Sequence, residues 1–483
     1  MKGFHFKDSV EVAQELFIAT LSMPSRSRAL ASGFSLPRDA PLAAVYVTTH
    51  RVSFLSGAQA SNTPVEATLD LHSLHTSSVD TAMPLSLTHD VRSLRFLVNQ
   101  VEPSDMNIGI VGCGYVADLY TSTISNHPSL RLIGVCDVNE TRARTLAERR
   151  GAWMSTDMIA FVRRPEVEMI VNLTPPEHHS AVTSEAIRHS KPCYSEKPFA
   201  TSFIEGRSLV ELARQANVPL ASAPCSMLGE AAQTAWRAIR QGIIGTPRLV
   251  YANLDDGAVH RMAYDRWVTP RGLPWPHENE FRHGCVIEHA MYHLTWLVMM
   301  FGPVTSGTSF ATPLWNAKCP SDQVASPDIS VAVLRHTSGV VSRVTCGVAA
   351  RRDRSFLVVG DDGELHVSDC WNFMSPVNVL RIRAEIPPGR EASSAYLSDP
   401  EELMMARAPN FSHKCGDAND MDYCRGIAEF TDAIQNGRPS RLGPAFSLHC
   451  LEVQDHMNRP GPHTFSTTTW AQLPELIPMP WAN

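Results

Sequence analysis

Two glycines and an alanine in G-x-G-x-x-A spacing, Gly112, Gly114 and Ala117, directly follow a short apolar run from Ile108 to Val111. In this spacing the first glycine permits a tight turn, and the second lets backbone N–H groups approach a phosphate without an intervening Cβ. The small third residue lets a helix pack close to the strand, and the start of that helix attracts an anion. The pattern therefore predicts a site for the pyrophosphate of a dinucleotide.

A carboxylate stands at the end of the next apolar run, where Asp137 follows residues Leu130 to Cys136. At this position an acidic side chain can accept hydrogen bonds from an adenosine ribose, and its charge would repel a 2′-phosphate. Arg142 and Arg144 follow closely enough in the sequence to receive such a phosphate instead. We therefore expect NAD as the cofactor, with NADP as the alternative.

A lysine next to a proline is the second group that could take part in a reaction. Ser195-Glu196-Lys197-Pro198 follows one apolar strand, and Thr174-Pro175-Pro176 follows the strand before it. Proline restricts the residue before it away from helical geometry, and the bond between them can be cis. We therefore expect Lys197 to be held at the carboxyl edge of a parallel sheet, where ligands bind, facing the cofactor.

The elements that must position these groups alternate between strand and helix from Met106 onward. Helices are predicted over 141–150, 177–189 and 203–216, and strands over 167–173, 193–196 and 219–223. This alternation with short crossovers predicts an α/β fold that begins with a doubly wound parallel sheet of the Rossmann type. Before Met106, only 43–49 and 51–55 have the composition of strands.

Composition narrows the classes of function. The chain has 483 residues, 43% of them hydrophobic, and a net charge of −7 without a basic block, so we expect no nucleic-acid partner and no membrane surface. The apolar segment 294–301 is bounded by Gly302-Pro303 and predicts a buried helix end rather than a membrane span. Eleven cysteines without a C-x-x-C pair indicate reduced thiols and a cytoplasmic location.

The chain resembles the glucose-fructose oxidoreductase, inositol dehydrogenase and MocA (Gfo/Idh/MocA) family over residues 106–460. The resemblance rests on GCGYVA at 112–117, CD at 136–137, NLTPPEHH at 172–179 and EKP at 196–198. It implies a Rossmann domain followed by a C-terminal α/β domain with a large, mostly antiparallel open sheet, which often mediates homo-oligomers. It also implies an NAD(P)-dependent dehydrogenase that acts on a sugar, a sugar derivative or a cyclitol.

The family resemblance also assigns site residues. Its catalytic histidine lies in the pattern G-G-x-x-x-D-x-G-x-H-x-x-D, which we match to Gly284–Trp296, so that His293 takes the histidine position and His289 the first aspartate position. Glu288 then supplies a carboxylate from the neighbouring position. The predicted catalytic residues are Lys197 and His293, and the predicted substrate contacts are His289, Glu288 and Trp275. The predicted cofactor contacts are Gly112, Gly114, Tyr115, Val116, Ala117, Asp137, Thr174, Pro175, His178, Glu196 and Lys197.

In the predicted reaction, a hydride moves between nicotinamide and a carbinol carbon while His293 takes or returns the hydroxyl proton. Lys197 stabilises the negative charge that develops on the same oxygen. Two other interpretations remain open. The chain could bind a nicotinamide cofactor without dehydrogenase activity, as a regulator or structural partner, or His289 and His293 could bind a metal with His277, Glu280 or His283.

The predicted organisation has four parts. Residues 1–105 form an extension of unknown structure, possible origins being disorder, an accessory module or a misassigned start. Residues 106–226 form the Rossmann domain, 227–460 the substrate and oligomerisation domain, and 461–483 a C-terminal tail. In the third part, strands are expected over 248–254, 329–335, 339–347, 356–360 and 364–367, and helices over 422–436 and 444–458.

Overall fold

The computed structural model describes residues 42–48, 51–56, 65–70 and 105–483, apart from 316–317, 319–325, 386–387, 389–390, 392–395 and 409–419. Residues 1–101 form a unit separate from the rest of the chain. Their described part is a three-stranded antiparallel sheet of β1 (Leu42–Thr48), β2 (Arg51–Ser56) and β3 (Val65–Asp70). β1 and β2 overlap the two segments for which strands were considered, and the remainder of the predicted extension lies outside the described residues.

The second unit begins with the predicted Rossmann sheet, in which six parallel strands have the order β6-β5-β4-β7-β8-β9. The strands are β4 (Met106–Val111), β5 (Leu130–Cys136), β6 (Trp153–Ser155), β7 (Met169–Asn172), β8 (Cys193–Ser195) and β9 (Leu220–Ser222). The helices that connect them are α4 (Tyr115–Thr123), α5 (Glu140–Arg150), α6 (Met158–Val162), α7 (Pro176–Arg188) and α8 (Phe203–Ala216). The predicted alternation is confirmed, and β6 and α6 were not anticipated.

A nine-stranded sheet follows, with the order β17-β16-β15-β14-β10-β13-β12-β11-β18. Its pairs are antiparallel except β10 with β13, which are parallel, so the predicted large, mostly antiparallel sheet is confirmed. Its strands are β10 (Pro247–Asp255), β11 (Val304–Thr312), β12 (Ile329–His336), β13 (Val341–Gly347), β14 (Phe356–Gly360), β15 (Gly363–Val367), β16 (Val377–Arg381), β17 (Glu401–Glu402) and β18 (Gly461–Ser466).

The edge strand β18 differs from the sequence-based expectation of a tail after residue 460. Residues 462–466 pair with β11 along 306–310, which extends the large sheet at the end of the chain. The segment alternates exposed and buried side chains only weakly, and Gly461 and Pro462 open it. Its pairing partner therefore decides its structure more than its own composition does.

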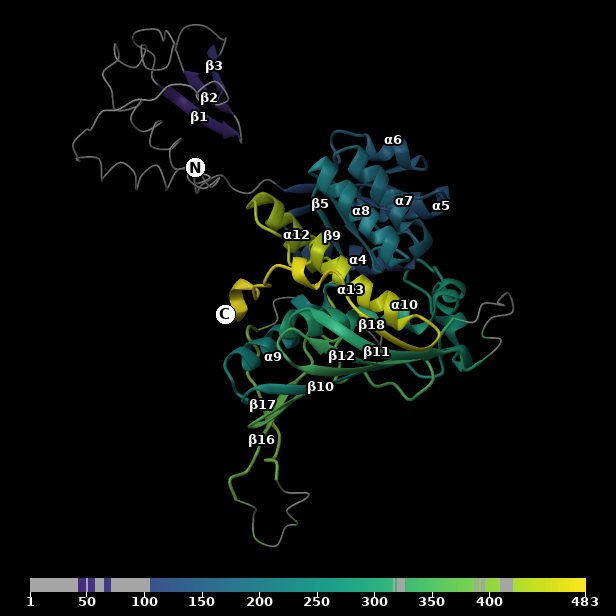
Figure 1. Ribbon diagram of the computed structural model, residues 1–483. Helices are drawn as coiled ribbons and strands as arrows, with labels where there is room; N and C mark the ends of the chain where they lie inside the picture. The colour runs from purple at the N-terminus through teal and green to yellow at the C-terminus, as the bar shows by residue number, and fades with distance from the viewer. Residues whose placement is uncertain are drawn as a thin grey trace, which may run out of the picture. The chain divides into compact units, whose positions relative to one another are not determined.

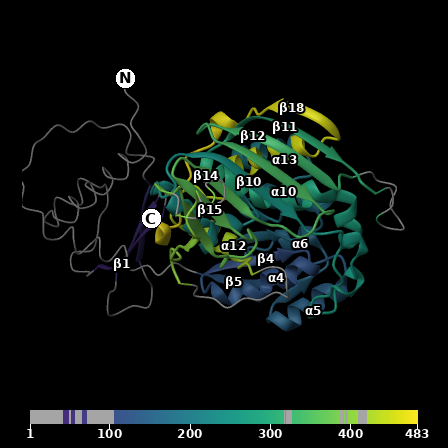
Figure 2. The same ribbon diagram turned by 90° about the horizontal axis from the view of Figure 1, so that it is seen from below.

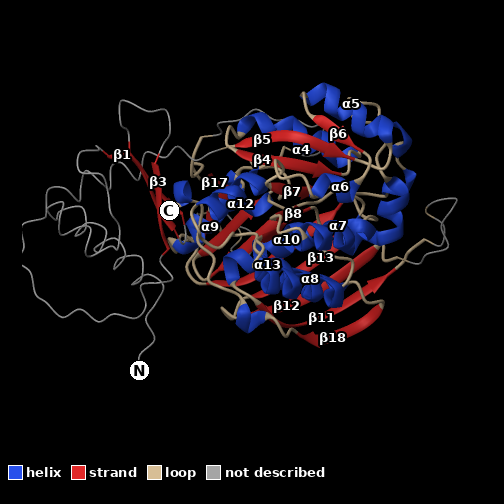
Figure 3. Ribbon diagram, turned by 90° about the horizontal axis from the view of Figure 1, so that it is seen from above, coloured by secondary structure: helices blue, strands red, loops and turns tan. Residues whose placement is uncertain are grey.

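Helices fill the space between the two sheets. The relevant helices are α9 (Glu230–Arg240), α10 (His277–Phe301), α12 (Arg425–Gln435) and α13 (Pro444–Met457). Figure 1 shows α10 and α13 above the large sheet, and α13 also packs against α8 and β9 of the Rossmann sheet. Figure 3, which colours helices and strands separately, shows the same layer of helices from above. One hydrophobic core includes side chains from both sheets, such as Ile108 of β4 and Phe356 of β14, together with Trp296 of α10.

The helix α10 bends at Gly284, whose φ of 78° and ψ of 173° are not helical. A Cβ at this position would lie 2.8 Å from the carbonyl oxygen of Pro327, so a larger residue could not occupy the bend without displacing backbone. After the bend the helix continues to Phe301 and ends at Gly302 as a buried segment, as predicted. No helix among the described residues has the length and apolar character needed to cross a bilayer.

Candidate active site

The glycine-rich turn between β4 and α4 has the geometry that the sequence predicts. Gly112 has a φ of 97°, and a Cβ there would lie 2.5 Å from the carbonyl oxygen of Leu173. A Cβ on Gly114 would meet no atom within 4 Å, so the space beside the turn is open. Gly114 is also the N-cap of α4 and supplies no side chain to its first amides. These amides and the open space fit a dinucleotide pyrophosphate.

Asp137 lies directly after β5 and faces this turn. Its Oδ2 accepts a hydrogen bond of 2.7 Å from the backbone N–H of Cys113, and its Oδ1 accepts one of 2.8 Å from the N–H of Asn139. Each carboxylate oxygen has a further lone pair, which leaves acceptor capacity for ribose hydroxyls. Arg144, one of the two arginines considered for a 2′-phosphate, forms an exposed ion pair with Glu140.

Lys197 and Glu196 follow β8 at the carboxyl edge of the Rossmann sheet, and the peptide bond from Lys197 to Pro198 is cis. The Glu196 carboxylate accepts a hydrogen bond of 2.8 Å from the hydroxyl of Tyr120 and one of 2.6 Å from the backbone N–H of Lys197. The first bond links the loop to α4, and the second holds the backbone at Lys197.

The Lys197 side chain reaches α10. Its Nζ donates to Glu288 Oε2 at 2.8 Å and to the Glu288 carbonyl oxygen at 2.9 Å, and the two side chains are 14% and 6% exposed. Burial lowers the pKa of Lys197, but the charge of Glu288 more than offsets this, so its pKa lies above the usual value. Burial likewise raises the pKa of Glu288, but Lys197 holds it below its usual value. Both groups are therefore charged at neutral pH.

Tyr292 lies one helical turn after Glu288 and therefore on the same face of α10. It packs on Trp371 at 4.7 Å between ring centroids. Burial raises the pKa of Tyr292, whereas the nearby Lys197 ammonium lowers it, and the net effect is a rise. The structure thus brings together a cation and a protonated phenol at the carboxyl edge of the Rossmann sheet.

His293 does not lie at this place, although the sequence analysis put it there. Its side chain is fully buried, and its Nε2 lies 2.7 Å from the carbonyl oxygen of Asn253 in β10. Its ring stacks on Phe356 of β14. The physical reason is the helical period: residue 293 is rotated about 100° from residue 292, toward the large sheet.

Three buried histidines predict a loss of stability in acid. Burial lowers the pKa of His293, His336 and His449 to about 4, whereas an imidazole in an unfolded chain titrates near about 6.5. The unfolded state therefore binds more protons than the folded state between these values, so stability is complete above the upper value and falls as the pH drops toward the lower one. We expect each histidine to lower the free energy of unfolding by up to about 1.4 kcal/mol for each pH unit of acidification between these two values.

Urea unfolding of the purified protein at pH 7, 6 and 5 measures this dependence. A His293→Gln variant, which keeps a side-chain donor for the Asn253 carbonyl, should show a shallower fall in the free energy of unfolding than the unaltered protein. Parallel curves for the two proteins would show that His293 is not buried as described.

His289 on α10 contacts the loop that follows β10. Its Nε2 lies 3.4 Å from Asp256 Oδ2, and Arg354 donates to Asp256 Oδ1 from Nε at 2.9 Å and from Nη2 at 2.7 Å. The Arg354 guanidinium lies over the ring of Trp371, which in turn contacts His289 and Tyr292. This chain of contacts fixes the ring against which Tyr292 packs.

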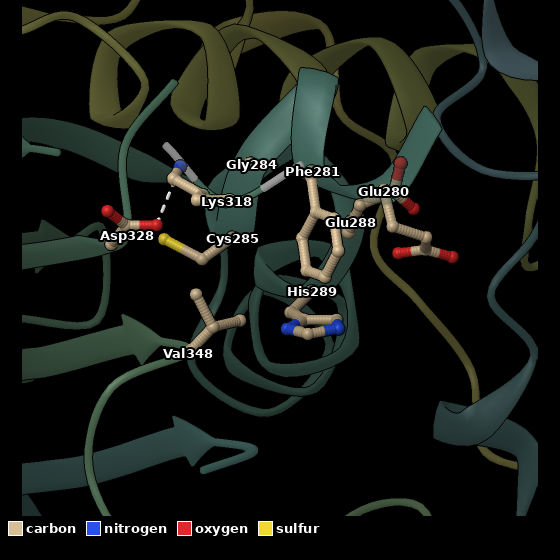
Figure 4. A pocket seen from close by; sticks show the side chains of 9 residues that line it. All are labelled: Glu280, Phe281, Gly284, Cys285, Glu288, His289, Lys318, Asp328 and Val348. Carbon is tan, nitrogen blue, oxygen red and sulfur yellow. Dashed lines mark ion pairs between the residues drawn. The ribbon is translucent and has the colours of Figure 1, made fainter. Parts of the chain in front are cut away.

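A pocket lies between the bend of α10 and the ends of the large-sheet strands (Figure 4). Its lining residues are Glu280, Phe281, Gly284, Cys285, Glu288, His289, Lys318, Asp328 and Val348. Figure 4 shows Glu280 beside Glu288 at one end and the ion pair of Lys318 with Asp328 at the other. Burial and the Glu288 charge raise the pKa of Glu280, which hydrogen-bonds to Glu288. Glu280 therefore lies beside the carboxylate that pairs with Lys197.

The other predicted residues occupy different places. Thr174 and Pro175 lie at the carboxyl end of β7, near the glycine turn, whereas His178 is exposed on α7. Trp275 belongs to an aromatic cluster with Trp267 and Phe281 and does not line the pocket. Tyr115, Val116 and Ala117 form the first turn of α4, with Ala117 buried against the sheet.

Sequence reasoning missed Tyr292 because of a shift of one position. If Gly284 is placed on the second glycine of the family pattern instead of the first, Glu288 takes the aspartate position and Tyr292 the histidine position. The structure supports this register, because Glu288 is the residue that contacts Lys197. Arg271 was also missed. Its side chain reaches the glycine turn from the loop before α10, and no local pattern indicates that contact.

The comparisons with known proteins agree with this geometry. A model of the oxidoreductase family with an NAD-binding Rossmann fold matches residues 106–223, and a model of the GFO/IDH/MocA C-terminal domain matches residues 232–366. Together these two matches cover more than half of the chain.

Among individual proteins, the chain is 25% identical over 267 residues to a D-apiose dehydrogenase from Paraburkholderia graminis, covering 54% of this chain and 66% of that protein. It is 32% identical over 105 residues to an inositol 2-dehydrogenase from Rubrobacter xylanophilus, covering 22% and 30%. The chain thus matches less than two thirds of the length of either relative. It is 24% identical over 287 residues to a mouse trans-1,2-dihydrobenzene-1,2-diol dehydrogenase, covering 58% and 79%.

Solved structures share the fold. The WlbA dehydrogenase from Bordetella pertussis, solved with NADH and UDP-GlcNAcA, gives a TM-score of 0.57 at 16% identity, covering 76% of this chain and 100% of that one. The aldose-aldose oxidoreductase from Caulobacter crescentus gives 0.59 at 15% identity, covering 75% and 100%. With the two family matches and the arrangement of both sheets, these findings show that the chain belongs to the Gfo/Idh/MocA family of oxidoreductases with an NAD-binding Rossmann fold.

Proposed function

We propose that this protein is an NAD(P)-dependent dehydrogenase that transfers a hydride between nicotinamide and a carbinol or carbonyl carbon of a sugar, a sugar derivative or a cyclitol. The observation that carries the proposal is the meeting of Lys197, held at the edge of the Rossmann sheet, with Glu288 and Tyr292 on one face of α10. The names of the D-apiose and inositol dehydrogenase relatives support the substrate class.

The chemistry needs a proton to move at the oxygen of the reacting carbon. Bound NAD(P) would supply the hydride acceptor or donor at its nicotinamide ring. In the reductive direction Tyr292, whose pKa is raised, donates its proton to the carbonyl oxygen, and in the oxidative direction its phenolate accepts the hydroxyl proton. The Lys197 ammonium stabilises negative charge on both the substrate oxygen and the phenolate, and Glu288 holds that ammonium in place. We therefore assign to Tyr292 the role that sequence analysis gave to His293.

Titration of the purified protein with NADH and NADPH, followed by nicotinamide fluorescence, tests the proposal before any substrate is known. Tight binding of one of them, followed by turnover on a sugar or cyclitol in a screen of such compounds, is the expected result. Binding without turnover on any of them would favour the alternative of a family member that binds the cofactor in a regulatory or structural role.

Metal-dependent catalysis has less support. Within the part of the chain that the structure describes, no group of three or more histidine, cysteine, aspartate or glutamate side chains is arranged to hold a metal ion. His289 and His293, the pair considered from the sequence, use Nε2 toward Asp256 and toward the Asn253 carbonyl respectively. Metal analysis of the purified protein measures this directly, and a stoichiometric metal needed for turnover would contradict our proposal.

Asp137 should set the cofactor preference toward NAD. Replacing it by alanine removes the negative charge that faces the 2′ position, and we expect the ratio of the NADPH to the NADH dissociation constant to fall about tenfold or more. The same fluorescence titration measures both constants, and Glu140→Ala, which removes an exposed acid nearby, is the matched control. Equal affinity of the unaltered protein for NADH and NADPH would refute the assigned role.

We also propose that the protein works in the cytoplasm as a homo-oligomer that joins through the large sheet. The nine described cysteines are free and buried, which fits a reducing compartment. Figure 2 shows the strands of the large sheet in front of the helices, and Phe310, Val331 and Val333 are exposed on β11 and β12. Light scattering measures the oligomeric state, and a monomer at micromolar concentration would contradict this part of the proposal.

A further inference from the structure

Arg271 links the C-terminal half of the chain to the glycine-rich turn. It lies at the tip of a tight loop before α10, where Thr269 Oγ1 accepts hydrogen bonds from the N–H groups of Arg271 at 3.2 Å and Leu273 at 3.3 Å. Val268 and Pro274 form a bridge across the base of this loop. The Arg271 side chain is only 5% exposed. A charged side chain with so little exposure needs partners, and it finds them on the Rossmann domain.

The guanidinium binds the turn itself. Nη2 donates to the carbonyl oxygens of Cys113 at 3.0 Å and Gly114 at 3.2 Å, Nε donates to Asp118 Oδ1 at 2.6 Å, and Nη1 donates to the carbonyl oxygen of Arg142 at 3.3 Å. Four contacts thus hold this one side chain in the groove between the first turns of α4 and α5. None of them uses the backbone N–H groups of Gly114 or Tyr115.

These contacts fix the direction of the amides that a phosphate would use. In a planar trans peptide the C=O and the N–H of the next residue point in opposite directions. Because Arg271 holds the carbonyl groups of Cys113 and Gly114, the N–H groups of Gly114 and Tyr115 point away from the guanidinium. These are among the first amides of α4, which have no side-chain cap.

The same contacts neutralise an unfavourable charge. Asp118 lies in the first turn of α4, is 6% exposed, and its Oδ2 has no hydrogen-bond partner among the residues that the structure describes. A buried carboxylate at this position would repel a pyrophosphate that binds at the start of the same helix. The positive charge of Arg271 offsets that repulsion, so that the attraction of the helix dipole for an anion remains.

We propose that Arg271 is a positioning residue for the dinucleotide, which aligns the phosphate-binding amides of the Rossmann turn and cancels the charge of Asp118 from the other half of the chain. The proposal rests on the proposed function, since it concerns the same cofactor site. Its consequence is that cofactor affinity depends on the docking of the loop before α10, so the two halves of the chain assemble the phosphate site together.

The test compares dissociation constants of NADH, measured by nicotinamide fluorescence, with melting temperatures of the same variants. We expect Arg271→Met to bind NADH about 30-fold more weakly, from the loss of charge-assisted hydrogen bonds and the exposure of the Asp118 charge. The double variant Asp118→Asn with Arg271→Met should recover only the part of that loss that the Asp118 charge causes, and Arg271→Lys should lie between Arg271→Met and the unaltered protein. Arg266→Met, an exposed arginine of the preceding segment, is the control and should bind normally.

The outcomes are distinguishable. A lowered melting temperature of Arg271→Met with unchanged or tighter NADH binding would show a purely structural role and overturn the inference. A double variant that binds no better than Arg271→Met would refute the role of the Asp118 charge. If Arg271→Met does not fold, the double variant and Arg271→Lys provide the same comparison. Failure of the unaltered protein to bind either NADH or NADPH would overturn the proposed function, and this inference with it.

Discussion

Replacement of Lys197 by methionine is expected to lower kcat by about 1000-fold while the dissociation constant of NADH changes by less than about fivefold. The ammonium lies in a nearly enclosed site, where its interaction with a developing oxyanion is stronger than in water. It touches α10 through Glu288 and is held by its own backbone, so its removal leaves the glycine turn and Asp137 intact. Steady-state kinetics on the substrate found in the screen, together with fluorescence titration, measures both quantities.

A single replacement leaves the buried Glu288 carboxylate without its partner, which could lower the stability by itself. The double variant Lys197→Met with Glu288→Gln removes both charges and should fold better while remaining as inactive as the single variant. Lys191→Met, at the opposite end of β8, is the matched lysine control, since Lys191 binds the carbonyl oxygens of Arg164 and Val167. Normal kcat in a folded Lys197→Met protein would show that its role is misassigned.

The groups predicted from the sequence are those whose function depends on neighbours along the chain. The turn at Gly112 and Gly114, the position of Asp137 after β5 and the cis bond after Lys197 each follow from a few adjacent residues. In such segments the backbone requirement and the chemistry coincide, because glycine or proline is needed where it stands. The doubly wound sheet and most of its helices were therefore predictable.

The groups that were not predicted depend on contacts between distant segments. Arg271 and Asp118 are separated by 153 positions, and no periodicity in either segment indicates their pairing. The parallel pairing of β10 with β13 and the addition of β18 to the sheet edge are likewise set by tertiary packing. A sequence pattern can propose such elements, but it cannot decide which of them meet.

In the helix α10, a site residue and a core residue differ by one position in the sequence. Tyr292 and His293 are adjacent, and both can exchange a proton, so the residue types alone do not separate them. The bend at Gly284 sets the rotation of the helix, and that rotation turns Glu288 and Tyr292 toward Lys197 and turns His293 toward Phe356. A shift of one position in the alignment therefore decides whether Tyr292 or the buried His293 is taken as the catalytic candidate.

Variants at these two adjacent positions should differ sharply. We expect Tyr292→Phe to lower kcat by about 100-fold to 1000-fold with little change in melting temperature, because it removes only the hydroxyl that exchanges the proton. The phenyl ring keeps its packing on Trp371. We expect His293→Gln to keep kcat within about threefold but to lower the free energy of unfolding by about 1 to 3 kcal/mol, because the amide does not replace the packing of the buried imidazole ring on Phe356.

The two variants distinguish Tyr292 from His293 as the residue that exchanges the proton, because one is expected to lose turnover and the other to lose stability. If His293 exchanged the proton, His293→Gln would lose turnover at unchanged stability and Tyr292→Phe would remain active. A pH profile adds an independent measurement: with Tyr292 as the acid, whose pKa is raised, the reductive kcat should stay level through neutral pH and fall only in alkali. With His293 as the acid, whose pKa lies at about 4, the reductive rate would already fall between pH 4 and neutrality.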